Sequence, residues 1–294
     1  MTRQYKNFHG RSLGGRRIFP SAVQSFLATS YPEGALKIEH NLVDHPLLEI
    51  DKLALLAESL PPASIDFNGS NPSRGVDSKP GAKSLSIGET IRNIEKTASW
   101  AVLKNVEQKK PFAELLHELL EELRPVIEER TGPLLNPQAF IVVSSPHAVT
   151  PLHFHAEHNI LMQLRGSKTV TVYPAGDRRF ASDKSHENYH LGGTGELPWH
   201  RNHERAGLPF ALGPAEGVYV PAMSPHHVQY GSAVSVSLSL TWRSEWSYAE
   251  ADARAFNGLI RKLGIDPKPP KRWPATNSGK ARAMRLWRRF RGIA

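Results

Sequence analysis

Residues 150–174 read TPLHFHAEHNILMQLRGSKTVTVYP, and they carry the clearest sequence signal for the fold. It holds two runs of apolar and β-branched residues separated by Gly166, a pattern typical of two strands joined by a tight turn. His153 and His155 stand two residues apart, just before the first run. Because residues two apart on a strand point to the same side, both imidazoles can face one metal ion.

Similar short runs occur on both sides of this stretch, from Ala139 onward: AFIVVSS, GVYVP and SAVSVSLSLTW. The front half of the chain shows helical spacing instead, over 51–60, 86–98 and 111–130, and a last helical pattern covers 247–264. Strands that follow a helical front half predict a mainly β fold with a helical extension, the strands forming a sandwich or closed barrel.

This pattern divides the chain into four expected segments. They are an N-terminal arm (1–34), a mainly helical extension (35–135), a barrel (136–245), and a C-terminal helix with a basic tail (246–294). The polar segment 175–214 is expected to be a long insertion between the barrel halves, at the rim of a site.

The net charge of +9 is concentrated at the C-terminal end. Residues 260–294 hold eleven Lys and Arg against one acid, Asp266, so the rest of the chain is close to neutral. A basic tail on a neutral body suggests contact with an anionic partner, or docking of the tail on the body itself.

Composition also restricts the chemistry and the location of the chain. With no cysteine, a metal must be held by nitrogen and oxygen ligands. No apolar run approaches the ~20 residues needed to span a bilayer, and the first residues lack the apolar segment of a secretory signal. We therefore expect a cytoplasmic protein without a transmembrane segment.

A third metal ligand is available in the sequence PAMSPHHV, residues 221–228, which offers His226 and His227 at the start of a later strand. Three neutral imidazoles with open coordination positions suit Fe(II), Zn(II), Mn(II), Ni(II) or Cu(II), and nitrogen ligation alone does not choose among them.

The spacing of these residues resembles the cupin motif and, more closely, the jumonji (JmjC) type of Fe(II) and 2-oxoglutarate oxygenase, in particular the branch with asparaginyl hydroxylases. The positions that carry the resemblance are Thr150, His153, position 155, Asn159, Gly166, Lys168, Gly217, Pro221 and His226. The resemblance implies a double-stranded β-helix, or jelly-roll, barrel. It also implies that His226 rather than His227 is the third ligand.

Roles for further residues follow from the same resemblance. In that family, two His and one carboxylate hold Fe(II), and 2-oxoglutarate chelates the metal while a Lys and a Thr bind its distal carboxylate. Carried over, His153, His155 and His226 would bind the metal, Lys168 and Thr150 would bind the cosubstrate, and Asn159 would be a nearby polar contact. A buried Lys needs an anionic partner, which agrees with such a role for Lys168.

One position departs from the family pattern, because His155 stands where the iron oxygenases have Asp. The change leaves the site one unit more positive, which should weaken the binding of hard cations. Glu157 shares strand parity with the histidines and could supply a carboxylate only if the strand bulged, so we expect it at the surface.

Three functions therefore stay open. The first is a 2-oxoglutarate-dependent hydroxylase of a protein or small-molecule substrate, and the second is a three-histidine cupin dioxygenase that does not use 2-oxoglutarate. The third is a non-catalytic barrel that senses a ligand or binds a partner. The family resemblance and the apolar C-terminal helix suggest a homodimer, and we expect the insertion's histidines, His186, His190, His200 and His203, to be solvated.

Overall fold

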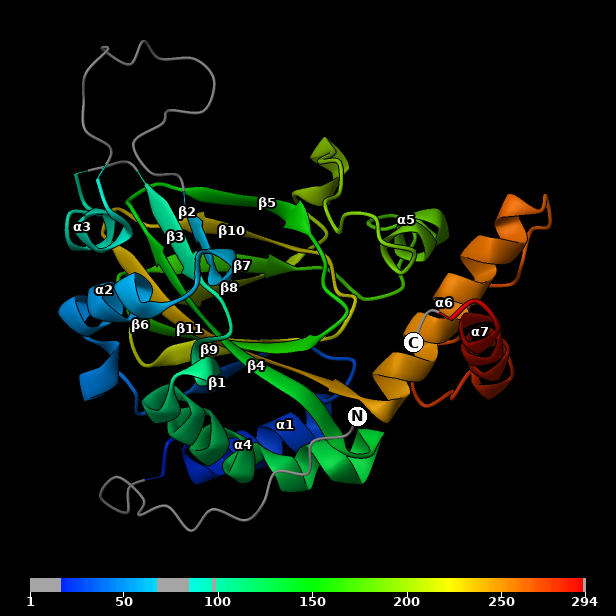
Figure 1. Ribbon diagram of the computed structural model, residues 1–294, viewed down its shortest axis with the longest axis horizontal. Helices are drawn as coiled ribbons and strands as arrows, with labels where there is room; N and C mark the ends of the chain where they lie inside the picture. Colours follow the sequence, from blue (N-terminus) through cyan, green and yellow to red (C-terminus); the bar gives the residue numbers. More distant parts are fainter. Residues whose placement is uncertain (1–16, 68–84, 97–98, 293–294) are drawn as a thin grey trace.

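The computed structural model describes residues 17–67, 85–96 and 99–292. Two antiparallel sheets dominate it, one of seven strands and one of four, with helices around them (Figure 1). The strands are β1 (Leu36–Glu39), β2 (Ile65–Phe67), β3 (Trp100–Leu103), β4 (Leu134–Ser144), β5 (Val149–His153), β6 (His158–Arg165), β7 (Lys168–Val172), β8 (Leu208–Leu212), β9 (Glu216–Val220), β10 (His226–Tyr230) and β11 (Ser235–Ser244).

The eight strands from β4 to β11 form the jelly-roll barrel that the family resemblance implies. Strand β8 lies within residues 175–214, so the expectation of an insertion is wrong for the last part of that segment. Strands β9, β6, β11 and β4 are neighbours in the larger sheet, and β5, β10, β7 and β8 make up the smaller one. Consecutive strands thus alternate between the sheets for most of the barrel, as in a double-stranded β-helix. The front half contributes β1 at one edge of the larger sheet, and β3 with β2 at the other.

Strand β11 illustrates how the sequence builds the two sides of the larger sheet. Its residues alternate between hydroxyl side chains, as in Ser237 and Ser239, and apolar ones, as in Leu238 and Leu240. The apolar set joins the main hydrophobic core outside the barrel, whereas Ser237 and Ser239 bond to inward-facing groups. In β11, the period of two therefore separates a polar face toward the barrel interior from an apolar face toward the outer core.

Helices cover the apolar outer face of the larger sheet. Helices α1, α2 and α4 contribute leucines and valines to the same core cluster as β4, β6 and β11. The helices are α1 (Ser21–Ser30), α2 (Ile50–Ser59), α3 (Ile87–Arg92), α4 (Lys110–Thr131), α5 (Asp183–Tyr189), α6 (Glu245–Lys262) and α7 (Ser278–Phe290), with 3-10 turns η1 (Pro46–Leu48), η2 (Pro62–Ser64), η3 (Val106–Gln108) and η4 (Arg201–His203).

Local signals explain where several helices begin. Ser86 caps α3 through a capping box with Glu89, and Pro111 lies in the first turn of α4, where a missing N–H is harmless. The expected N-terminal arm lies partly outside the described residues, and within it residues 21–30 form α1, which the sequence analysis missed.

The C-terminal helices form a pair beside the barrel (Figure 1). Helix α7 buries Ala281 and Met284 against α6, and Arg285 and Arg288 both reach Asp252 on α6. The basic tail therefore docks on α6, whereas Phe290 at the end of α7 is 88% exposed. Within the described part of the chain, none of the helices is both long and apolar enough to cross a membrane.

Candidate metal centre

The three histidines come together at one end of the barrel, where β5 stops and β10 starts. His153 is the last residue of β5, His226 is the first of β10, and the antiparallel register places them directly opposite each other. His155 lies just past the end of β5, in the loop to β6, rather than on the strand as expected. Its carbonyl accepts a 2.7 Å hydrogen bond from the backbone N–H of Met223, which fixes that loop.

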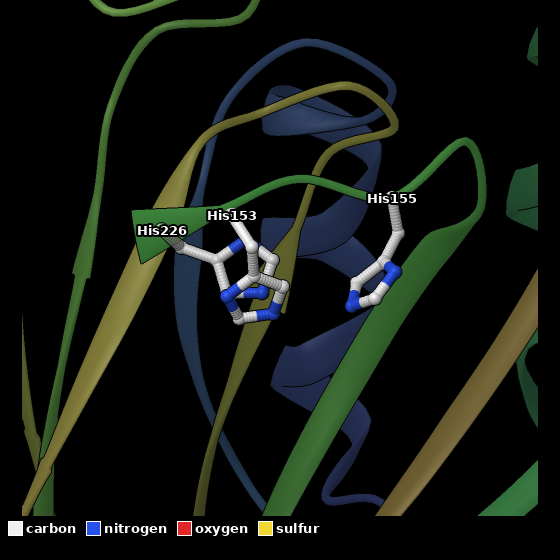
Figure 2. A group of neighbouring side chains, drawn as sticks. All are labelled: His153, His155 and His226. Atoms are coloured by element: carbon white, nitrogen blue, oxygen red, sulfur yellow. The ribbon is translucent and has the colours of Figure 1, made fainter. Parts of the chain in front are cut away.

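The imidazoles face one another closely enough to share an ion (Figure 2). One ring nitrogen from each residue lies within 4.8 Å of the others, and the ring centroids of His153 and His226 are 4.3 Å apart. Ligand nitrogens about 2.0–2.1 Å from a metal stand roughly 3–3.5 Å from one another, so a small inward movement completes the site.

Backbone hydrogen bonds select the tautomer of two of these rings. Nδ1 of His153 donates to the carbonyl oxygen of Pro151 at 2.7 Å, and Nδ1 of His226 donates to that of Ser224 at 2.9 Å. Each bond leaves Nε2 with a free lone pair and holds the ring in place. A hydrogen bond from the other ring nitrogen to a backbone carbonyl orients metal-binding histidines in this way.

The protonation state of the cluster also suits a metal. Desolvation lowers the pKa of His153, and desolvation together with the nearby His153 lowers the pKa of His155 to about 4, although the side chain of His155 also reaches solvent. Burial lowers the pKa of His226 well below its ordinary value, and the other two imidazoles add to this effect. All three rings are therefore neutral at pH 7, which is the form that binds metals.

Lys168 lies inside the barrel, toward the opposite end of the smaller sheet. Its ammonium group donates to the hydroxyl of Ser237 and lies 5.5 Å from the centre of the Tyr230 ring. The side chain is only 3% exposed, and burial lowers its pKa to about 7. Among the described residues, no carboxylate forms an ion pair with it, so the protein itself leaves this cation without a counter-charge.

The neighbours of Lys168 are also polar and face inward. Tyr230 pairs with Lys168 in the register of β10 and β7, and its hydroxyl lies 3.4 Å from that of Thr150 on β5. Asn159 on β6 accepts a 2.8 Å hydrogen bond from Ser239. The family resemblance implies roles near the cosubstrate for Thr150 and Asn159 but gives none to Tyr230. Strand parity was the available signal, because residues 226, 228 and 230 share one side of β10.

Gly166 fixes the turn that starts β7 at Lys168. Its φ is +68°, and a Cβ there would lie 2.2 Å from the carbonyl oxygen of Val234. Any other residue would meet both the strain of a left-handed conformation and a backbone clash. Gly166 therefore fixes the turn that determines where β7 begins and where Lys168 enters the barrel.

The insertion supports the metal-site end of the smaller sheet from outside. Its residue Glu196 pairs with His153 through backbone hydrogen bonding, and Leu197 packs with Phe154 in a separate core cluster. His186 and His203 are buried, which makes the expectation of solvated histidines wrong for both. His186 packs on Phe154, so these rings form the outer support of the ligand loop.

Two further candidates take other roles. Glu157 reaches Arg243 at 3.5 Å, so it does not join the histidines. His227 points away from the cluster and packs against Trp199, with ring centroids 4.8 Å apart. Within the described residues, His153, His155 and His226 are the group of potential ligands that meets.

The sequence profile of the cupin-like domain family matches residues 53–248, about two thirds of the chain. The chain belongs to the cupin-like domain family. Its matched region contains all three histidines, Lys168 and Thr150, whereas α7 and most of α6 lie beyond it. None of the curated proteins matches this cupin-like protein at the level of sequence.

Among solved structures, the cupin-like protein is similar in fold to YcfD from Escherichia coli. One YcfD structure has a TM-score of 0.51 at 18% identity, over 92% of this chain and 68% of the other. A second, of YcfD as a ribosomal oxygenase in complex with cobalt and 2-oxoglutarate, has a TM-score of 0.50 at 17% identity, over 92% and 67%. These likenesses support the barrel fold.

Proposed function

We propose that the protein is a metal-dependent oxygenase that uses Fe(II) and 2-oxoglutarate to hydroxylate a substrate. The observation that carries the proposal is a pairing inside one barrel: three neutral imidazoles at one end and a buried, uncompensated Lys168 farther in. A divalent cation and a dicarboxylate would satisfy both features together.

The separation between the two features suits a short dicarboxylate. In the register, Val172 of β7 is opposite His226 and Lys168 is opposite Tyr230, so the two ends are four residues apart. At about 3.3 Å per residue this is roughly 13 Å of strand, of which the lysine side chain and the ligand imidazole bridge a part. A ligand that chelates the metal with one end can then place its other carboxylate on Lys168.

The residues present fit this pair of groups. His153, His155 and His226 would hold Fe(II), and Lys168, Thr150 and Tyr230 would bind the distal carboxylate, with Asn159 beside them. When bound together, Fe(II) and 2-oxoglutarate supply oxidative decarboxylation to succinate, coupled to hydroxylation of a C–H bond. The protein holds the imidazoles neutral, fixes the tautomers of His153 and His226, and keeps the lysine buried.

The substrate class is part of the proposal. The YcfD structures of similar fold are described as those of a ribosomal oxygenase, so a polypeptide is the first class of substrate to test. A small molecule is the second class of substrate to test. We also expect a homodimer and a cytoplasmic location.

Succinate formation tests the proposal directly. Purified protein loaded with Fe(II) is incubated with 2-oxoglutarate and oxygen, with and without pooled polypeptides, and succinate is quantified. We expect succinate from the unaltered protein and a loss of at least tenfold in His226→Ala. If 2-oxoglutarate binds but no succinate forms with any substrate pool, hydroxylase function is rejected in favour of ligand sensing.

A second function is favoured by one observation, the imidazole of His155 at the carboxylate position of the family. Without that carboxylate, a three-histidine centre can bind an anionic substrate directly and react with oxygen without 2-oxoglutarate. Oxygen consumption that needs Fe(II) but is unaffected by 2-oxoglutarate and by Lys168→Met would support this function over the first.

A further inference from the structure

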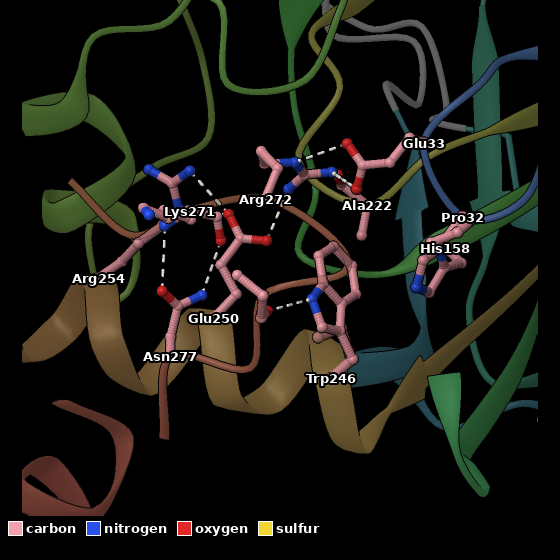
Figure 3. A network of polar contacts seen from close by, with 12 residues as sticks. Pro32, Glu33, His158, Ala222, Trp246, Glu250, Arg254, Lys271, Arg272 and Asn277 are labelled. Carbon is pink, nitrogen blue, oxygen red and sulfur yellow. Dashed lines mark hydrogen bonds and ion pairs between the residues drawn. The ribbon is translucent and has the colours of Figure 1, made fainter. Parts of the chain in front are cut away.

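The C-terminal extension reaches back to the loop that carries the metal ligands. Arg272, from the segment between α6 and α7, lies outside the matched family region, yet its Nη2 donates to the carbonyl oxygen of Ala222 at 3.0 Å (Figure 3). The next residue, Met223, donates its backbone N–H to the carbonyl of His155, and His226 follows three residues later. The Arg272 guanidinium thus contacts the short loop that precedes His226 and that is hydrogen-bonded to His155.

The position of this guanidinium is fixed from several sides. Its Nε donates to Glu33 at 3.0 Å and its Nη1 to Glu250 at 2.7 Å, and it lies over the Trp246 ring at 5.1 Å from the centroid. Glu250 is itself buried and bound by Arg254 at 2.7 Å. Figure 3 shows Arg272 between the two carboxylates, with Ala222 on the side of Glu33. Such a charge-paired network is rigid because moving any member leaves a buried charge unpaired.

The loop that Arg272 contacts needs an external restraint. Met223 has a φ of +67°, a left-handed conformation that is unfavourable for a long side chain. Residues in such conformations persist only where their surroundings fix them. The two hydrogen bonds described are made by the C=O and the N–H of one peptide unit, Ala222–Met223, so together they fix the peptide plane that precedes the left-handed Met223.

We propose that Arg272 is a positioning residue, which holds the loop 221–225 in the conformation that brings His155 and His226 to one metal ion. The proposal rests on the proposed function only in that these histidines bind a metal. It assigns a role in the site to the C-terminal extension, through a contact that neither the tail's charge nor the ligand motif indicates.

A purely structural role predicts a different result. If Arg272 only attached the C-terminal segment to the body, its replacement would change stability without changing the metal site. Arg272→Lys separates the two roles, because lysine keeps a positive charge near Glu33 and Glu250 but cannot make the three directed contacts of the planar guanidinium. Arg285→Ala is the matched control, since it removes an arginine of the same extension from an ion pair with Asp252.

Cobalt(II) is the probe, because its visible spectrum reports ligand number and geometry. The full chain is titrated with Co(II) as the unaltered protein, Arg272→Lys and Arg285→Ala, and thermal unfolding is recorded for each. We expect Arg272→Lys to unfold cooperatively, to bind Co(II) about 10–100-fold more weakly, as for other outer-sphere changes, and to show an altered spectrum. Arg285→Ala should stay within about twofold of the unaltered protein.

An unchanged affinity and spectrum in folded Arg272→Lys would overturn the inference. If that variant does not unfold cooperatively, Glu33→Gln replaces it, because it removes one anchor of the guanidinium at the half-buried end; unchanged Co(II) binding there overturns the inference equally. Failure of the unaltered protein to bind Co(II) would overturn this inference and the proposed function together. Binding of Co(II) without binding of 2-oxoglutarate would reject only the proposed function.

Discussion

His153 and His226 lie directly opposite each other in adjacent antiparallel strands, with ring centroids 4.3 Å apart and each Nδ1 bound to a backbone carbonyl two residues earlier. This arrangement leaves both Nε2 atoms free and turned toward a common point. The strand pairing of the barrel thus creates two thirds of a metal site, and the loop after β5 provides the remainder through His155.

Removal of His226 should abolish tight metal binding. We expect His226→Ala to weaken Co(II) or Mn(II) binding at least 100-fold, because one of the three metal ligands is lost. The neighbouring His227→Ala is the control, since that ring packs on Trp199 outside the cluster and its loss should change affinity less than about threefold. Isothermal titration calorimetry measures both variants, and equal losses in the two would contradict the assignment of the ligands.

Replacing His155 by Asp should increase affinity for hard cations. A carboxylate removes one unit of positive charge from the site and offers oxygen to Mn(II) or Fe(II). We expect Mn(II) to bind roughly tenfold more tightly to His155→Asp than to the unaltered protein, and more weakly to the neutral His155→Asn. The contrary order would show that His155 is not a ligand.

The buried charge of Lys168 should lower the free energy of unfolding and contribute to the binding of 2-oxoglutarate. Its pKa is lowered to about 7 from an ordinary value of 10.5, a difference equivalent to roughly 5 kcal/mol at about 1.4 kcal/mol per unit. Below pH 7 the lysine is charged in both the folded and the unfolded states, so the full cost applies. Between pH 7 and 10.5 the unfolded state binds more protons, so this contribution to stability improves as pH rises.

Lys168→Met should therefore raise the free energy of unfolding at pH 7 by at least about 1 kcal/mol while reducing 2-oxoglutarate binding more than tenfold. Urea denaturation and calorimetry give the two quantities. Ser237→Ala is the matched control, because it removes only the hydroxyl bound to the ammonium group. A Lys168→Met protein that is less stable and still binds 2-oxoglutarate would contradict the role of the lysine.

Binding of a dicarboxylate should also depend on pH in a defined direction. A carboxylate on Lys168 raises the lysine pKa above 7, so binding is accompanied by proton uptake and weakens as pH rises above 7. The dissociation constant should be nearly constant from pH 6 to 7 and increase by up to about tenfold per unit above it. Affinity that improves toward pH 9 would rule out an ammonium–carboxylate contact.

The ion pairs behind the metal loop should contribute strongly to stability. Burial alone would raise the pKa of Glu250, but Arg272 and Arg254 reverse this and lower it, so its stabilising effect is present above about pH 4.5 and is lost as pH falls below that value. We expect Glu250→Gln to cost roughly 3–5 kcal/mol at pH 7 in urea denaturation. Arg285→Ala removes a half-exposed arginine, and its partner Asp252 keeps the contact with Arg288, so this change should cost about 1 kcal/mol or less. Equal costs in the two variants would contradict the stabilising role of Glu250.

The barrel was predictable because its strands are short apolar and β-branched runs separated by turn residues, and because its ligands follow the spacing of a known family. The family resemblance pointed to Lys168, Thr150 and Asn159 but left open their contacts, which in the structure are with Ser237, Tyr230 and Ser239. Helix α1 was missed because its larger apolar residues, Val23, Phe26 and Leu27, span little more than one turn among serine and threonine, and packing against α4 decides its conformation.

The contacts around the site could not be predicted, because they join residues far apart in sequence. Arg272 and Glu33 are separated by 239 positions, and no local pattern marks either of them. Burial of His186 likewise depends on the packing of α5 against α6 and Phe154, which the polar composition of the insertion conceals.

The most direct test of the central claim is anaerobic titration of metal-free protein with Fe(II) and then 2-oxoglutarate, followed by visible absorption. If 2-oxoglutarate chelates Fe(II) in this site, a charge-transfer band appears, which is lost in His226→Ala and strongly weakened in Lys168→Met. Absence of the band, with Fe(II) shown to be bound, would contradict it and favour the three-histidine dioxygenase. Absence of iron binding would contradict the metal centre itself and favour a non-catalytic barrel.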